Sequence, residues 1–373
     1  MRLAAQDIEI VVQDNSDDAQ LGIDVAKLAD HRVHYYHDPR RLSMSENYES
    51  ALSRCRGEYV GVIGDDDGVT EFLPMVTRWA AQENLDLVVP TNSAHFVWPD
   101  LKLPGNKTPA PGELRFNLPS GKVSKSDNTE ELLKVLSAAG QSFASLPKAY
   151  YGIVSRRSLE MVHSKAGKYF PGISPDMAAA VALSLVKPHV YHIDIPCFLP
   201  GSSGRSNAGL SGTNRHIGSL RDQPHLSKAE LDQWNRSIPY FYSVPTIWAE
   251  ACVGAILLMG HGDLLRHFNF PGLYAQLLSY YPAYRSEILR CYPAAVAASG
   301  NAAAMGWFQL SSSLVKLALL RAKYLIRRPF AQGAKRKHEA VCGLQDIRSA
   351  CSALENELCL RKFTPEACTP KSL

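Results

Sequence analysis

The sequence has 373 residues, enough for one large domain or two ordinary ones. Hydrophobic residues make up 46% and charged residues 20%, which excludes wholesale disorder. The 40 Lys and Arg against 36 Asp and Glu give a formal net charge of +4, too small to predict nucleic acid as a partner.

The cysteines and the apolar segments give expectations about the cellular compartment and about membrane insertion. The eight cysteines include no Cys-x-x-Cys pair, and the first residues contain no apolar core of a signal peptide. We therefore expect reduced thiols in a cytoplasmic protein. The longest apolar run, residues 251–260, has about half of the roughly twenty residues that a membrane-spanning helix needs, so integral membrane insertion is not expected.

Runs of β-branched and apolar residues alternate with helical patterns three times in the first part of the chain. The expected strands span residues 8–12, 33–36, 59–63 and 85–90, and the expected helices span residues 19–29, 43–56 and 71–83. Ser43 and Glu46 predict a capping box for the second of these helices, and Gly57 predicts its left-handed end. The alternation predicts an α/β fold with a Rossmann-like, mostly parallel sheet flanked by helices.

The rest of the chain carries weaker signals. We expect a loop insertion at residues 101–125, helices at 129–139 and 175–186, strands at 150–155 and 190–195, and a Gly/Ser loop at 201–212. Beyond about residue 225 the pattern is mostly helical. We therefore divide the chain into an α/β domain, residues 1–220, and a helical C-terminal region, residues 221–373.

Two acidic clusters, residues 14–18 and 65–67, follow expected strands at their carboxyl ends, where sheets of this kind bind ligands. Three adjacent carboxylates at 65–67 repel one another unless a cation neutralises them or water solvates them. Mg²⁺ and Mn²⁺ prefer oxygen ligands and commonly bridge to substrate phosphates. The second cluster therefore predicts a metal site, and an ordinary solvated turn is the alternative.

Three segments resemble one known family. Residues 8–16, Ile-Glu-Ile-Val-Val-Gln-Asp-Asn-Ser, are similar to the second strand of the family-2 glycosyltransferases and its nucleotide-binding Asp. Residues 41–52 resemble the helix that precedes the metal motif of that family, and residues 56–67 resemble the strand and the D-x-D site itself. The segments match in order and spacing over about eighty residues, and a weaker likeness continues to about residue 210.

The resemblance implies a GT-A fold and an enzyme that moves a sugar from a nucleotide-diphosphate sugar to the hydroxyl of a glycan or lipid-linked acceptor. Asp14, with Asn15 beside it, would bind the base or ribose of the nucleotide. The cofactor would be Mg²⁺ or Mn²⁺. Work in surface polysaccharide or glycolipid synthesis is the usual task of the family.

The D-x-D position departs from the pattern of the family. Asp66 aligns best with the metal ligand and Asp65 with the middle position, whereas Gly64 stands where many relatives have the first Asp. The division of labour among the three carboxylates therefore stays open. We assign Asp66 and Asp67 to the metal and Asp65 to the donor.

An inverting glycosyltransferase also needs a base that takes the proton of the acceptor hydroxyl. The family places a carboxylate at the start of a later helix. Asp176 fits that position, because Pro175 favours a helix start and Asp176 follows it in the first turn. The alternative is an ordinary acidic residue that the helix dipole favours there. Inversion at the anomeric carbon is what the resemblance implies.

Two cationic features remain. Arg205 and His216 lie in or just after the Gly/Ser loop, which would close over a diphosphate with Arg205 paired to it, or else be a solvated connection. Residues 314–337 carry eight Lys and Arg and no acid. Such a segment would lie on an anionic membrane surface, giving peripheral contact at the inner face, or else pack on the domain as a solvated helix.

Relatives begin with a strand and a helix that precede the equivalent of Ile8, and residues 1–5 look like the end of that helix. The missing strand would lie inside the sheet and contribute to the nucleotide pocket. Its loss would leave two strand edges unpaired. A start assigned too late is the explanation we favour, and a degenerate, inactive relative is the other.

Two further function classes compete. Residues 65–70, Asp-Asp-Asp-Gly-Val-Thr, imitate the nucleophile loop of haloacid-dehalogenase-like phosphatases, but no Asp-Asp pair follows residue 67 to supply their second acidic site. A sugar- or partner-binding protein on a decayed glycosyltransferase scaffold is the non-catalytic alternative.

Overall fold

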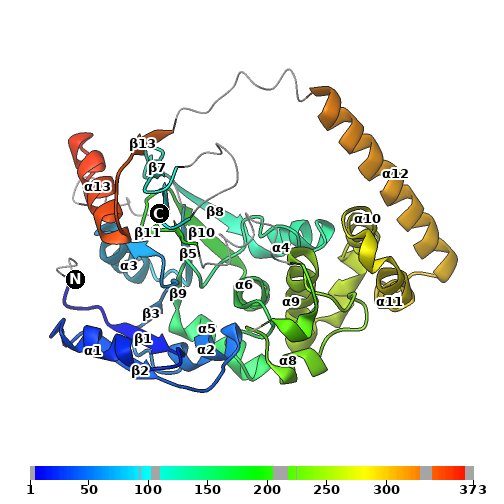
Figure 1. Ribbon diagram of the computed structural model, residues 1–373, viewed down its shortest axis with the longest axis horizontal. Coiled ribbons are helices and arrows are strands. Elements are labelled where there is room, and N and C mark those ends of the chain that lie inside the picture. The colour runs from blue at the N-terminus through cyan, green and yellow to red at the C-terminus, as the bar shows by residue number, and fades with distance from the viewer. Residues whose placement is uncertain are drawn as a thin grey trace.

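The computed structural model describes residues 5–91, 94–101, 110–204, 217–223, 225–327 and 338–365. Sheets with flanking helices form one side of the molecule, and helices alone form the other (Figure 1). One long helix, α12 (Ala303–Arg327), stands out from the helical side.

The central sheet has five strands in the order β3-β9-β5-β10-β8. Their bounds are β3 (Tyr59–Val60), β9 (Ile153–Ser155), β5 (Leu87–Pro90), β10 (His189–Ile193) and β8 (Val123–Asp127). The pair β5 and β10 is parallel, whereas β9 is antiparallel to both β3 and β5, and β8 is antiparallel to β10. The sheet is therefore mixed, and the prediction of a mostly parallel sheet was wrong. Its cause is β9, which enters between two co-directed strands from the opposite direction.

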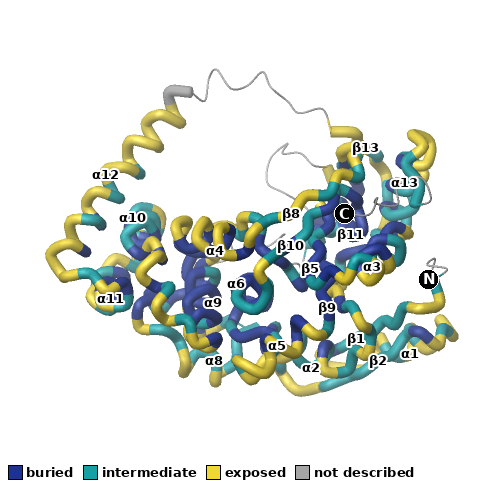
Figure 2. The backbone as a smooth tube through the Cα atoms, turned by 180° about the vertical axis from the view of Figure 1, so that it is seen from behind, coloured by how far each residue is buried: buried dark blue, intermediate teal, exposed yellow. Residues whose placement is uncertain are grey.

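Helices pack on this sheet and bury it (Figure 2). They are α3 (Phe72–Gln82), α4 (Asn128–Ser137), α5 (Arg156–Ala166) and α6 (Pro175–Val186). The predicted helix at 175–186 is confirmed, with Pro175 in its first turn. Small and apolar residues cover α6 on almost all sides, so it lies buried between the sheet and the helical region.

The first part of the chain forms a separate unit of β1 (Ile10–Asp14), α1 (Gln20–Ala26) and β2 (Val33–His37). The two strands pair in parallel with Ile10 opposite Val33, and no described strand pairs with the other edge of β1. Four of the five side chains of β1 are only half-buried, and α1 has no buried residue. This is the open edge that the sequence predicted for an interior strand without its neighbour.

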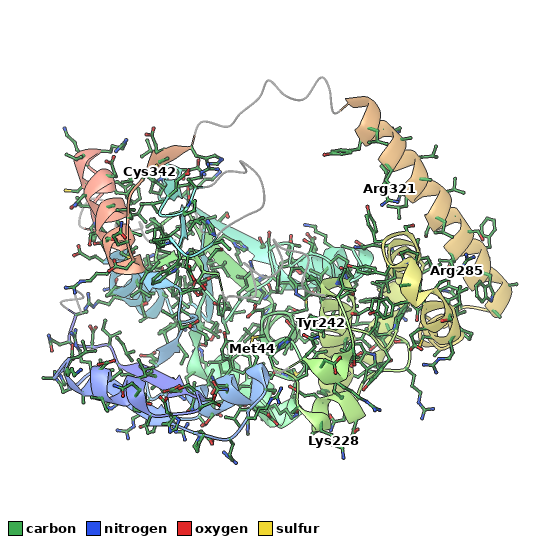
Figure 3. All side chains as sticks on the ribbon, viewed as in Figure 1. Met44, Lys228, Tyr242, Arg285, Arg321 and Cys342 are labelled. Carbon is green, nitrogen blue, oxygen red and sulfur yellow. The ribbon has the colours of Figure 1, made fainter. Side chains whose placement is uncertain are left out.

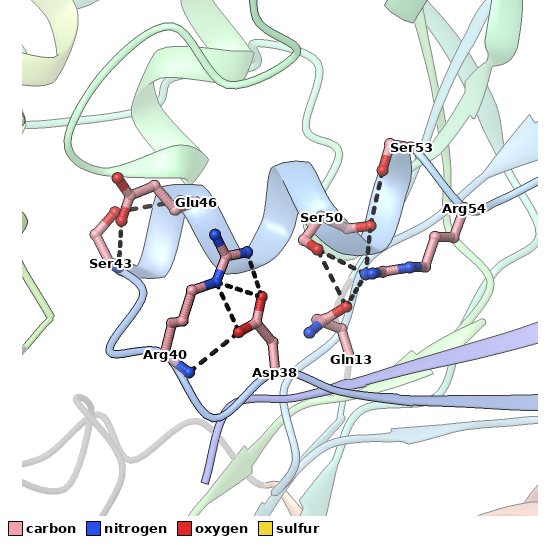
Figure 4. A network of polar contacts seen from close by, with 8 residues as sticks. All are labelled: Gln13, Asp38, Arg40, Ser43, Glu46, Ser50, Ser53 and Arg54. Atoms are coloured by element: carbon pink, nitrogen blue, oxygen red, sulfur yellow. Dashed lines mark hydrogen bonds and ion pairs between the residues drawn. The ribbon is translucent and has the colours of Figure 1, made fainter.

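The helix α2 (Met44–Leu52) connects this unit to the central sheet. Its predicted capping box is confirmed, since the Glu46 amide donates to Ser43 Oγ and the Ser43 amide donates to Glu46 (Figure 4). The helix ends at Leu52 with Ser53 in the right-handed helical conformation, so the prediction of a Gly57 stop was wrong. The last turn at Ser53 needs no left-handed residue to end the helix.

Two smaller sheets adjoin the central one. Strand β4 (Gly68–Val69) pairs with β11 (Phe198–Leu199), and a four-stranded sheet has the order β12-β6-β7-β13. Its strands are β12 (Gly201–Ser202), β6 (Ala94–Val97), β7 (Leu114–Phe116) and β13 (Glu339–Val341). The expected loop insertion thus contains β7 and the start of β8. Ser124 and Lys125, part of the polar pattern that suggested a loop, lie on β8, an edge strand whose side chains are partly exposed.

The C-terminal segment returns to the α/β side. Strand β13 pairs with β7, and helix α13 (Ile347–Leu360) buries Ala350, Leu354 and Leu358 in the same core as α3 and β6. The predicted division at residue 220 therefore does not hold for this segment. Its burial depends on apolar contacts with strands more than two hundred residues earlier, which periodicity along the chain does not reveal.

The helical side agrees with the prediction for residues beyond 225. It contains η1 (Leu220–Asp222), α8 (Lys228–Asp232), α9 (Val244–Leu258), η2 (Gly262–His267), α10 (Phe270–Tyr280), η3 (Pro282–Tyr284), α11 (Arg285–Ala298) and α12. Helix α9 packs on α6 and joins this side to the sheet. Within the described residues, one helical segment, Ala303–Leu325, is long and apolar enough to cross a membrane, and 11% of its most apolar window is buried.

Candidate active site

The acidic turn (residues 64–67) follows β3 and leads into β4. Asp65 is exposed, Asp66 is half-buried and Asp67 is buried. Strand β4 is backed by α13, because a Cβ at Gly68 would lie 2.6 Å from Cys351 Sγ. The acidic turn therefore leads into a strand that packs against α13, a helix near the C-terminal end of the chain.

Four donors saturate the Asp67 carboxylate. Its Oδ2 accepts from the Gly64 amide at 2.8 Å and from Tyr150 Oη at 2.6 Å. Its Oδ1 accepts from Tyr151 Oη at 2.6 Å and from the Gly201 amide at 2.8 Å. A carboxylate has about four acceptor positions, and these donors occupy the ones that a cation would need. The arrangement favours a structural role for Asp67 and leaves the other two carboxylates of the turn for a metal.

Two glycines allow the turn to close this tightly. A Cβ at Gly64 would lie 2.7 Å from Tyr150 Oη, and a Cβ at Gly201 would lie 1.8 Å from the Asp66 carbonyl oxygen. At Gly201 the neighbour is backbone, so no other side chain fits there, whereas at Gly64 a side chain would displace the Tyr150 hydroxyl from Asp67.

Asp66 is oriented by the strands around it. The Trp98 indole N–H donates to its carbonyl oxygen at 2.8 Å, and the Ser203 amide donates to its Oδ2 at 3.1 Å. The described residues contain no group of three His, Cys, Asp or Glu that would hold a metal by themselves. Mg²⁺ sites that use substrate phosphates need only one or two protein carboxylates, and Asp65 with Asp66 meets that requirement.

Asp176 lies in the first turn of α6. Burial raises the pKa of its carboxyl group from 3.8 to about 6, the Lys148 ammonium opposes this rise, and the negative charge of Asp67 adds to it. The structure thus places Asp176 within electrostatic range of the acidic turn, as a site shared by the two requires. A carboxylate with a pKa near neutrality suits proton transfer at physiological pH.

A tyrosine between these carboxylates was missed by the sequence analysis. Burial raises the pKa of the Tyr48 phenol, and the charges of Asp176, Asp67 and Asp65 raise it further, so the phenol stays neutral between them. Its ring stacks on that of Tyr150 with centroids 6.3 Å apart. Tyr48 belongs to the apolar pattern of α2, and its place in that pattern gave no sign of a site.

Asp14 ends β1 and is buried. Its Oδ1 accepts from the Ser16 amide at 2.9 Å and from Ser16 Oγ at 2.6 Å, and its Oδ2 accepts from Tyr35 Oη at 2.7 Å. Burial raises its pKa, but the hydrogen bonds from Ser16 and Tyr35 outweigh burial and hold it below its usual range. Asn15 is exposed.

Helix α2 links the two acidic positions. Gln13, next to Asp14, accepts hydrogen bonds from Ser50 and Arg54 near the end of the helix (Figure 4). Tyr48, on the same helix, lies among the carboxylates of the acidic turn and Asp176. Helix α2 therefore lies beside the end of β1 through Gln13, and beside the acidic turn and Asp176 through Tyr48.

The predicted cations Arg205 and His216 lie outside the described residues. The loop that carries them leaves the described structure at Gly204. Its start lies at the acidic turn, because the Ser203 amide donates to Asp66 Oδ2.

Comparison with known proteins finds one family and two solved structures to which this chain is similar. Residues 2–143 match the sequence profile of the family Glycosyl transferase family 2. Two solved structures are similar, both with 14% sequence identity: TarS of S. aureus, with a TM-score of 0.39 over 78% of this chain and 50% of that one, and TarS 1-349 of S. aureus, with a TM-score of 0.38 over 79% and 82%. The chain thus spans half the length of the first of these structures.

A search of curated proteins finds none that matches. The family match covers the Asp14 position, α2 and the acidic turn, in the order in which the structure brings them together. Residues 2–143 are therefore similar to the family-2 glycosyltransferases, and the structure has an α/β fold.

Proposed function

We propose that the enzyme transfers a sugar from a nucleotide-diphosphate sugar to a hydroxyl of a glycan or lipid-linked acceptor, with inversion at the anomeric carbon. The observation that carries the proposal is the convergence of Asp65, Asp67 and Asp176 on the neutral phenol of Tyr48. This cluster has an exposed carboxylate, Asp65, for a metal and a half-buried carboxylate, Asp176, for proton transfer. We propose that the enzyme works in surface polysaccharide or glycolipid synthesis.

Each residue has one role in this proposal. Asp14 and Asn15 bind the base or ribose of the donor, and Asp65 and Asp66 hold Mg²⁺ or Mn²⁺, which would neutralise the charge of the diphosphate when bound. Arg205, in the loop whose first residues lie beside Asp66, pairs with the same diphosphate. These residues fix the donor before the acceptor binds.

Asp176 takes the proton of the acceptor hydroxyl as that oxygen attacks the anomeric carbon. The bond from the anomeric carbon to the diphosphate breaks as the new glycosidic bond forms, and the nucleoside diphosphate leaves. Burial beside Asp67 keeps the pKa of Asp176 near 6, so the group is mostly ionised at neutral pH and ready to accept a proton. Asp67 holds the turn through its four hydrogen bonds.

Calorimetric titration with a panel of nucleoside diphosphates in the presence of Mn²⁺ tests the donor site. Asp66→Asn should weaken binding roughly tenfold to a hundredfold, because it removes a charged contact to the metal. Asp263→Asn, an exposed change on the helical side, should leave affinity unaltered. Equal affinity in Asp66→Asn, or binding by the wild type that a chelator does not weaken, would remove the metal from the proposal.

A further inference from the structure

Helix α12 carries an apolar face that the described protein leaves exposed. Phe308, Val315 and Leu319 are 70%, 61% and 60% exposed. They are spaced seven and four residues apart, so they lie on one side of the helix. Three large apolar side chains aligned in this way differ from the single exposed ones that occur on any surface.

The opposite face is held against α10 and α11. Gly306 and Leu310 are buried there, and Tyr292 Oη donates to the Gly306 carbonyl at 2.6 Å. Farther along, the Arg321 guanidinium lies 4.1 Å from the centroid of the Tyr280 ring (Figure 3). These contacts fix the rotation of α12 about its axis, and Phe308, Val315 and Leu319 lie on the exposed side.

The charges of α12 have one sign. Between residues 303 and 325 the helix has Lys316, Arg321 and Lys323 and no Asp or Glu. Lys316 and Lys323 are both exposed and seven residues apart, so they share one flank of the apolar face. An apolar face beside a basic flank is complementary to an interface that is apolar inside and anionic at its surface.

We propose that α12 docks this enzyme on an anionic lipid bilayer, lying in the plane of the interface. The apolar face enters the boundary of the acyl chains, and Lys316 and Lys323 stay among the lipid phosphates. The helix does not cross the bilayer, because one face of it packs on α10 and α11 and the cations Lys316, Arg321 and Lys323 would be buried in hydrocarbon. A second copy of the chain is a poorer occupant, since two basic helices would repel each other.

Flotation of the full-length protein with vesicles tests this docking. Wild type should bind vesicles of phosphatidylcholine and phosphatidylglycerol in equal parts and should bind pure phosphatidylcholine far more weakly. Lys316→Gln with Lys323→Gln should weaken partition into the anionic vesicles about thirtyfold, because each lysine near the surface contributes roughly fivefold. Lys165→Gln with Lys228→Gln removes the same charge from exposed positions elsewhere and should have little effect.

The apolar face is tested separately. Val315→Ser with Leu319→Ser should reduce partition at least about tenfold, while Leu118→Ser, at an exposed apolar position on the other side of the protein, should not. Circular dichroism checks that each variant keeps its helices. Unchanged binding of either α12 variant, or equal weakening by the control pair, would overturn the docking face.

Two further outcomes would also overturn the proposal. Protein that stays with the vesicles through alkaline carbonate extraction would be a spanning protein. A wild-type dimer in sedimentation that Val315→Ser with Leu319→Ser dissociates, without loss of lipid binding, would make the face a subunit interface. Donor binding, measured by the titration above, should be the same in the α12 variants, so failure of this proposal leaves the proposed function intact.

Discussion

The Asp14 turn (residues 14–18) and the acidic turn (residues 64–67) both follow strands, but they have very different supports. The Asp14 turn ends a two-stranded sheet whose side chains are mostly half-buried, beside a helix with no buried residue. The acidic turn is enclosed by a five-stranded sheet, two small sheets and α13. Similar sequence patterns thus lead to a loosely covered turn at Asp14 and a tightly packed turn at Asp67.

Burial accounts for this difference. Strand β5 in the central sheet is paired on both edges and covered by helices, whereas β1 has a described partner on one edge only. Apolar burial stabilises by roughly 25 cal/mol per Å², so the two regions should differ in local stability by several kcal/mol. The sequence of a strand sets which of its side chains could be buried, and the neighbouring strands and helices determine which of them are buried.

The largest effect is expected from Asp176, which belongs to the packed side. Asp176→Asn should lower turnover about 10²- to 10⁴-fold and leave affinity for the nucleoside diphosphate nearly unchanged, because it removes the base and not the donor contacts. Initial rates with a glycan acceptor, together with donor titration, measure the two quantities. Loss of donor binding with retained turnover would move Asp176 to the donor side.

Thermal unfolding provides the control for this variant. The pKa of Asp176 in the folded protein, about 6, lies above its ordinary value of 3.8. The stability tied to the protonated group is therefore complete below pH 3.8 and is lost as the pH rises through about 6. Asp176→Asn should raise Tm at pH 8 and change it little at pH 4, so its loss of turnover cannot be ascribed to unfolding.

Truncating one leucine in each region tests directly whether the two regions differ in stability. Leu87 on β5 is 1% exposed and Leu21 on α1 is 46% exposed. Leu87→Ala should cost about 2–5 kcal/mol of unfolding free energy, and Leu21→Ala less than about 1 kcal/mol. Urea denaturation measures both. Similar losses would mean that the β1–β2 unit is as well covered as the central sheet.

Each of the two turns accepts a hydrogen bond from a tyrosine hydroxyl, so removing each hydroxyl compares the stability of the two turns. Tyr151 Oη donates to the buried Asp67 carboxylate, and Tyr35 Oη donates to Asp14. Tyr151→Phe should cost about 1.5–3 kcal/mol, because it removes a hydrogen bond to a charged group in a packed site. Tyr35→Phe should cost less, since Tyr35 belongs to the β1–β2 unit, whose side chains are mostly half-buried. A larger loss of unfolding free energy from Tyr35→Phe than from Tyr151→Phe would show that the Asp14 turn is the more strongly stabilised of the two.

The smallest expected effect is a shift of the pH profile. The Lys148 ammonium lowers the pKa of Asp176 against burial and Asp67. Lys148→Met should therefore raise that pKa above about 6 and move the acidic limb of turnover to higher pH. Lys165→Met, an exposed control, should leave the limb in place. A limb that moves to lower pH would show that another group sets it.

Most local elements could be predicted because their signals lie within a few residues. The capping box of Ser43 and Glu46, the helix start at Pro175 and the strand before the acidic turn are examples. The role of Asp67 could not be predicted, since its four donors come from segments far apart in the chain as well as from the turn itself. The same holds for Tyr48, whose neighbours come from α6 and the acidic turn.

Residue types and their spacing along the chain were enough to indicate the resemblance of residues 2–143 to one family, the alternation of strands and helices, and the candidate carboxylates. Only the tertiary structure decided which carboxylate is saturated, which one has a pKa near 6 and where the C-terminal helix packs. Those properties depend on burial and on donors brought together across the fold. Strand β9 is the plainest case, because its own residues predict a strand, but its direction follows from the gap between β3 and β5 that it fills.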